Sequence, residues 1–186
     1  MLTERIIGAF TFRKGVYAEV ENDASFTGTA WLIVVVVAFL NQLGTFAFES
    51  GWLVSLLLGT VFSVVGFAIA AYVVAWVGKS FFQADVTFDE MVRTLGLAYV
   101  WRVIGLAGIL GGVINCILAP ALIVAAILGL VAWFVAAKEA LDLEWGQTIV
   151  TVILGFLIIL VFSIISGLIL AVLGIGAASI WSAFGF

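Results

Sequence analysis

The sequence predicts an all-α integral membrane protein with five transmembrane helices and a short N-terminal helix in the membrane interface. Hydrophobic residues make up 66% of the 186 residues and charged residues only 10%, against about 45–50% and about 25% in soluble domains. Five long apolar runs follow one another, and the charged residues gather in the connections between them. A soluble fold of this size could not cover so much apolar surface, so its solvent must be lipid.

Residues 1–25 precede the first long apolar run within a single membrane domain, 1–186. Leu2, Ile6 and Phe10 recur at helical spacing, and basic residues flank that face. This pattern is typical of a helix that lies in the membrane interface. The alternative is an ordinary soluble lead-in to the first span.

The five apolar runs are each bounded by polar or turn-forming residues. A helix rises about 1.5 Å per residue, so about 20 residues cross the hydrocarbon. The predicted spans are about 27–48, 52–77, 95–114, 120–137 and 148–174.

Polar amides and glycines fall inside two of these runs. Asn41 and Gln42 lie within the first run, where they either bond to a neighbouring helix or are hydrated near its end. The last run stays apolar to about Ala178, so we expect it to tilt or to break near Gly174 and Gly176.

Small residues recur at spacings of three and four on several spans. Small side chains let two helix backbones approach closely, so we interpret these faces as packing seams and candidate partner contacts, in preference to a pore lining. The candidate contacts are Ser55, Gly59, Ser63, Gly66, Gly105, Gly108, Gly112, Ala125 and Gly129.

The longest polar interruption, residues 78–102, contains a helix start signal. Thr87 followed three residues later by Glu90 fits a capping box, in which each residue's side chain bonds to the backbone of the other. Acidic Asp89 and Glu90 also suit the positive end of a helix. A helix should therefore begin near Phe88.

Arg102 follows this segment and has two interpretations, because an arginine at the centre of a span costs about 2.5–3.5 kcal/mol on insertion scales. In the first, Tyr99, Trp101 and Arg102 mark the interface and the chain enters the membrane only afterwards. In the second, Arg102 lies deeper and pairs with a carboxylate. In both, the side chain can lean toward its helix N-terminus and reach outward.

Pro120 decides the predicted division between the third and fourth spans. Proline is tolerated in the first turn of a helix but not in its interior. We therefore expect a turn over residues 115–119 and a new helix from Pro120.

The basic residues predict the orientation. Given five spans, six of the seven fall on the side of the N-terminus: Arg5, Arg13, Lys14, Lys79, Arg93 and Lys138. By the positive-inside rule the N-terminus is cytoplasmic and the C-terminus lies on the opposite side.

Several function classes are excluded or unsupported by composition. Because the chain has no histidine, catalysis by Ser–His or Cys–His pairs and metal binding through histidines are excluded. The net charge of −4 and the scattered basic residues give no sign of nucleic-acid binding. We expect no cofactor and no enzymatic activity.

Several segments together resemble the Yip-type family, the Ypt/Rab-interacting membrane proteins and their prokaryotic relatives. The segments are Gly15-Val16-Tyr17, Gly78-Lys79-Ser80-Phe81-Phe82, Thr87-Phe88-Asp89-Glu90, Leu95-Gly96-Leu97-Ala98-Tyr99 and Lys138-Glu139-Ala140. The resemblance implies a cytoplasmic N-terminus and no known catalysis, and in eukaryotic members it implies a role in membrane traffic or organisation. One departure is Trp101-Arg102, where the family often has proline.

We therefore expect a non-catalytic protein of a prokaryotic cell membrane that contacts partner proteins within the bilayer. It would be either a free-standing organiser of the Yip type or an accessory subunit of a larger respiratory, photosynthetic or transport complex. The alternative from another class is a small transporter or channel, with Arg102, Asn41, Gln42 and Asn115 along its path.

Overall fold

The computed structural model describes residues 1–46, 52–110 and 112–172, without the side chains of 45, 46, 54, 55, 112–116, 118 and 162–172. These residues form helices and no strand. The helices are α1 Leu2–Phe10, α2 Val16–Glu21, η1 Ala24–Phe26, α3 Thr27–Phe46, α4 Trp52–Phe82, α5 Phe88–Ala98, η2 Tyr99–Leu110, α6 Gly112–Leu141 and α7 Trp145–Val172, where η marks a 3₁₀ helix.

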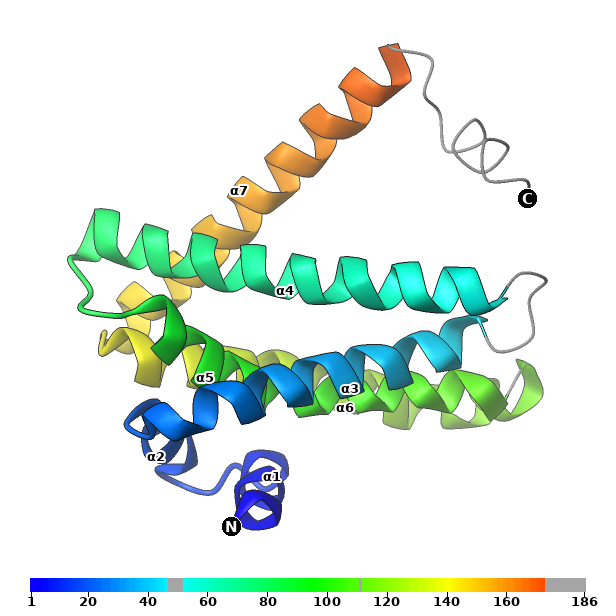
Figure 1. The fold of residues 1–186 in the computed structure, drawn as a ribbon, viewed down its shortest axis with the longest axis horizontal. Coiled ribbons are helices and arrows are strands. Elements are labelled where there is room, and N and C mark those ends of the chain that lie inside the picture. Colours follow the sequence, from blue (N-terminus) through cyan, green and yellow to red (C-terminus); the bar gives the residue numbers. More distant parts are fainter. Residues whose placement is uncertain (47–51, 111, 173–186) are drawn as a thin grey trace.

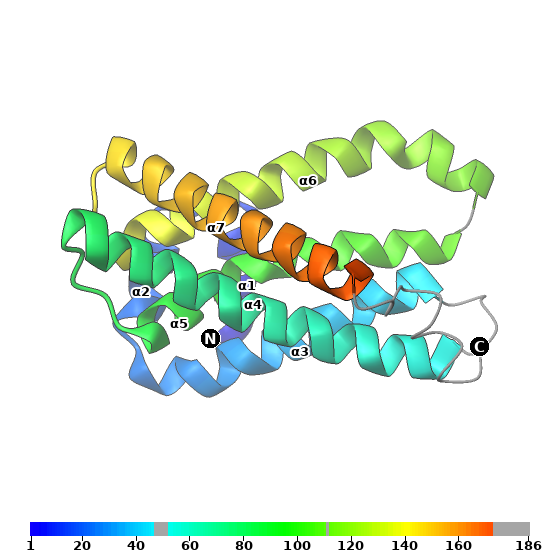
Figure 2. The ribbon, with the colours of Figure 1, turned by 90° about the horizontal axis from the view of Figure 1, so that it is seen from above.

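The long helices α3, α4 and α6 run along the long axis of the molecule (Figure 1), and Figure 2 shows that α6 lies apart from α3 and α4. Helix α3 packs against both α4 and η2, and α6 packs against α5 and η2. Helix α7 packs against α4 and then diverges from the other helices (Figures 1 and 2). Helices α1 and α2 lie against one end of this bundle.

Among the described residues, four segments are long and apolar enough to cross a membrane: Ala24–Gly44, Leu56–Phe82, Phe88–Leu110 and Ala119–Leu141. In α7 the stretch Trp145–Val161 is a shorter apolar helix. The expected starts of the first two spans coincide with those of α3 and α4. Helix α4 continues past Val77 to Phe82, α6 runs from Gly112 to Leu141 where a span over 120–137 was expected, and α7 begins at Trp145. The expected break near Gly174 and Gly176 lies outside the described residues.

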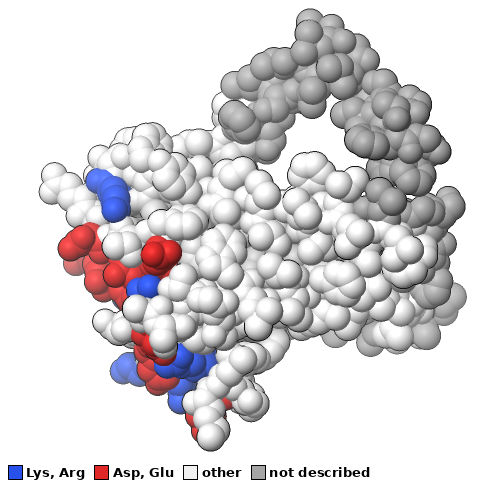
Figure 3. All heavy atoms as spheres, in the orientation of Figure 1, with Lys and Arg blue, Asp and Glu red and all other residues white. Residues whose placement is uncertain are grey.

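The described charged side chains gather at one end of the molecule (Figure 3). This end carries α1, α2 and the connections that follow α4 and α6, as expected from the placement of the two polar loops on the side of the N-terminus. The rest of the described surface in this view carries no charged side chain. The molecule therefore has a charged end and a long apolar body.

The predicted capping box is confirmed at the start of α5. The Thr87 hydroxyl accepts a hydrogen bond from the Glu90 amide at 3.2 Å, and the Glu90 carboxylate accepts one from the Thr87 amide at 2.6 Å. Every residue from Met91 to Val100 is buried, including Arg93. Helices α1, α2, α3, α4 and α6 all contact α5.

The predicted turn at 115–119 is wrong. Helix α6 is continuous from Gly112 to Leu141, with Pro120 in its interior. The reason lies in the preceding element, because the 12 residues of η2 form a 3₁₀ helix. At about 2.0 Å per residue instead of about 1.5 Å, η2 is about 6 Å longer than an α-helix of the same residues. The chain thus reaches the far end by Leu110, four residues before the predicted end at Ile114.

Candidate functional site: a groove between α4, η2 and α6

An open groove of about 840 Å³ lies on the apolar body. Its walls come from α4, η2 and α6, with Asn41 of α3 and Phe156 of α7 at its edges. A volume of this size falls within the range of about 300–1,000 Å³ that is typical of small-molecule sites.

The groove gathers most of the candidate contacts predicted from the sequence. Ser63, Gly66, Gly105, Gly108, Ala125, Gly129 and Arg102 all line it. Gly59 instead lies in the contact between α3 and α4. Ser55 and Gly112 lie outside the residues whose side chains are described. Segments far apart in the sequence thus present their small residues to one space.

Two rows of η2 residues line the groove, one of them with Trp101 and Ile104 and the other at the edge that packs on α3. A 3₁₀ helix has about 3.0 residues per turn, so residues three apart lie directly above one another. Tyr99, Arg102, Gly105 and Gly108 follow this spacing, and all four line the groove. In an α-helix, with about 3.6 residues per turn, the same residues would rotate away from a common edge.

Glycines allow η2 to pack closely against α3. A methyl group added at Gly44 would collide with the carbonyl oxygen of Gly105, and one added at Gly108 would collide with the carbonyl oxygen of Gly44. One added at Gly105 would meet the side-chain amide of Asn41. Gly44 was not among the predicted contacts, because a lone glycine near the end of an apolar run carries no periodic signal.

The two amides of α3 bond to neighbouring helices, which decides between their two predicted roles. The Asn41 amide donates to the carbonyl oxygen of Arg102 at 2.9 Å. The Gln42 amide donates to the carbonyl oxygen of Gly59 at 3.1 Å and to the Ser63 hydroxyl at 2.9 Å. Both amides therefore tie α3 to the two helices beside it.

The Arg102 side chain is exposed and lies over the ring of Tyr99, 5.1 Å from its centroid. Among the described residues, no ion pair joins its guanidinium to a carboxylate. The arrangement therefore lacks the carboxylate partner that the deeper of the two sequence interpretations required. The contact with Tyr99 directs the side chain back toward the N-terminal end of its helix, as both interpretations expect.

Trp101, the residue before Arg102 in the sequence, shows at which end of the molecule Arg102 lies. The Trp101 indole donates to the carbonyl oxygen of Ala9 at 3.3 Å. Its ring also packs on Phe10 at 5.1 Å and on Phe12 at 5.7 Å between centroids. Arg102 thus lies at the level of the N-terminal segment that Trp101 contacts, although it is also fourteen residues into the apolar segment Phe88–Leu110.

No group of three or more histidine, cysteine, aspartate or glutamate residues that could hold a metal occurs in the described part of the chain. The groove is instead apolar and aromatic, with Arg102 as the one charged residue among those that line it.

The helical bundle, its apolar body and its charged end define a polytopic membrane protein of the all-α class. A family model described as the Yip1 domain matches residues 7–167. The chain therefore belongs to the Yip1 domain family, in agreement with the resemblance found in its sequence. No curated protein and no solved structure matches the chain.

Proposed function

We propose that the protein acts without catalysis, through helix contacts with partner proteins inside the bilayer, as a membrane organiser of the Yip type. In this proposal all five predicted spans cross a prokaryotic cell membrane, with α1 in the interface. The N-terminus is cytoplasmic and the C-terminus lies on the opposite side. Membership of the Yip1 domain family supports the membrane role.

The observation that carries this proposal is the uncovered small-residue surface of the groove. A methyl group added at Gly66 would meet nothing within 4 Å, and Ala126 of α6, which also lines the groove, is exposed. Within a protein, small residues are useful where another backbone approaches. Here they face open space, so the approaching helix would belong to a partner.

Filling the groove tests the proposal. Gly66→Leu and Ala126→Leu place bulk where the partner helix would pack, whereas Ile127→Leu changes an exposed residue of α6 outside the groove. We expect the wild type and Ile127→Leu to run as a larger assembly after extraction in mild detergent, and the two groove variants to run alone. A wild type that always runs alone would contradict the proposal.

The same extraction separates the organiser from the accessory subunit. An accessory subunit is held in fixed proportion within one large complex, whereas an organiser dissociates from its partners on dilution. Constant stoichiometry through successive dilutions would favour the accessory subunit of a respiratory, photosynthetic or transport complex.

A small transporter is the second candidate, because the groove brings polar groups of Asn41, Ser63 and Arg102 together. Against it, the Asn41 and Gln42 amides already bond to neighbouring helices, and Asn115 lies outside the described side chains. Flux in proteoliposomes that is lost in Arg102→Ala would favour transport over partner contact.

A further inference from the structure

One cation, Arg102, lies in the otherwise apolar groove, which is open to the side of the molecule. We infer that it binds an anionic phospholipid, with the phosphate on the Arg102 guanidinium and acyl chains along the groove. This inference concerns the same groove as the proposed function but does not rest on it, because the lipid would occupy the groove when no partner helix packs there. A partner helix needs the small residues of α4 and α6, whereas a headgroup needs the guanidinium.

Charge complementarity is the first step. Arg102 is the only charged residue among the described residues that line the groove, and its side chain is exposed. Its described polar neighbours are the Tyr99 ring beneath it and the amide of Asn41, which bonds to its backbone. A planar guanidinium presents paired donors that match phosphate oxygens.

The second argument is the position of Arg102 relative to the charged end of the molecule. Trp101 is held by the Ala9 carbonyl and by the rings of Phe10 and Phe12, so Arg102 lies at the level of the N-terminal segment. That segment carries charged residues such as Arg5 and Arg13, which must remain in contact with water or headgroups. A guanidinium that leans toward this end comes within reach of lipid phosphates.

The shape of the groove is the third step. Aromatic side chains of Phe67, Trp101, Trp133 and Phe156 form its walls, and α7 diverges beside it (Figures 1 and 2). A 20-residue helix, about 10 Å wide and about 30 Å long, occupies about 2,400 Å³. The groove holds about 840 Å³, so it could enclose acyl chains but only the surface of a helix.

Native mass spectrometry of the full chain in detergent tests the inference, with two lipid probes of identical acyl chains, phosphatidylglycerol and phosphatidylcholine. We expect the wild type to prefer phosphatidylglycerol by about tenfold, as one charge-assisted contact would give. Arg102→Gln should abolish the preference, and Arg102→Lys should retain part of it. Lys14→Gln, which removes an exposed cation outside the groove, should keep it in full.

Further measurements test whether a phospholipid, and not another anionic molecule, occupies the groove. Gly66→Leu narrows the groove, so it should weaken binding of both phospholipids and leave their ratio unchanged. Equal binding of the two phospholipids by the wild type, or a preference that survives Arg102→Gln in a folded variant, would overturn the inference. Tighter Arg102-dependent binding of a free fatty acid, or of a synthetic membrane helix with one glutamate, would also overturn it.

Discussion

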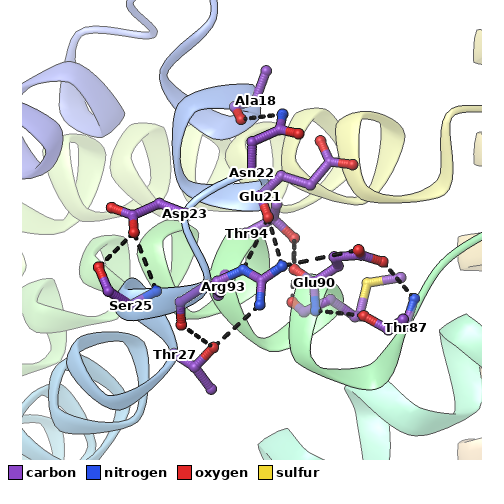
Figure 4. Close-up of polar contacts among 12 residues, drawn as sticks. Ala18, Glu21, Asn22, Asp23, Ser25, Thr27, Thr87, Glu90, Arg93 and Thr94 are labelled. Carbon is purple, nitrogen blue, oxygen red and sulfur yellow. Dashed lines mark hydrogen bonds and ion pairs between the residues drawn. The ribbon is translucent and has the colours of Figure 1, made fainter.

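Arg93 is a buried arginine that connects three helices at the charged end of the fold. Its guanidinium donates to the carbonyl oxygen of Glu21 at 2.5 and 3.0 Å and to the Thr27 hydroxyl at 3.2 Å (Figure 4). Glu21 is the last residue of α2, so this carbonyl has no partner within its own helix. The arginine supplies the missing donor and ties α2, α3 and α5 together.

Arg93→Ala should therefore lower the free energy of unfolding by about 2–3 kcal/mol, because a buried carbonyl loses a charged donor. Lys14→Ala, at an exposed position, should change it by less than about 0.5 kcal/mol. Tryptophan fluorescence during denaturant unfolding in micelles measures both variants. Equal stability of the two would show that the Arg93 contacts contribute nothing.

Glu21 also makes stability depend on pH. Burial, together with the negative charges of Asp142, Glu90 and Glu139, raises the pKa of its carboxyl from 4.5 to about 7. The folded state therefore holds this proton more tightly than the unfolded state. The resulting stabilisation is complete below about pH 4.5 and is lost as the pH rises through about 7.

We expect the Tm of the wild type in micelles to fall by a few degrees between about pH 5 and about pH 8. Glu21→Gln removes the titrating carboxyl, so its Tm should vary less over the same interval. A thermal scan of each variant at both pH values measures this. A wild type whose Tm rises over this interval would show that other groups dominate.

At the scale of elements, η2 determines where the third segment ends and contributes one wall of the groove. Its run of 12 residues is long for a 3₁₀ helix, a form that rarely exceeds three or four residues. The close backbone approach of Gly44, Gly105 and Gly108 explains how it is tolerated. Packing against α3 and the Asn41 bond to the Arg102 carbonyl compensate for its poorer internal hydrogen bonds.

Gly108→Ala should lower the free energy of unfolding by about 1–3 kcal/mol, because the methyl group would collide with the Gly44 backbone and the helices would have to separate. Gly66→Ala is the matched control, since its methyl group would meet open space and alanine favours a helix. Thermal unfolding of both variants in micelles distinguishes the two positions. Similar losses of stability would contradict this close contact.

At the scale of the whole molecule, the charged end and the apolar body predict which connections share a side of the membrane. Asp85 and Glu144 lie in the two connections at the charged end and are exposed. Ile117, near the start of α6 at the opposite end, is also exposed.

Single cysteines at these positions, in a Cys116→Ser background, should label in two groups. Asp85→Cys and Glu144→Cys should react with an impermeant reagent from the same side, and the positive-inside rule makes that side cytoplasmic. Ile117→Cys should not react from that side. Labelling of Asp85→Cys and Glu144→Cys from opposite sides would contradict the shared end.

The sequence by itself determined the membrane class, the family, the capped start of α5 and the gathering of charge at one end. These properties depend on composition, on residues a few positions apart, and on the cost of charge in lipid. Only the tertiary structure decided that η2 is a 3₁₀ helix, that Pro120 lies inside α6, and that Arg102 faces a groove. Those outcomes depend on contacts of Gly44 and Asn41 with residues some sixty positions away. No pattern of neighbouring residues predicts such a contact.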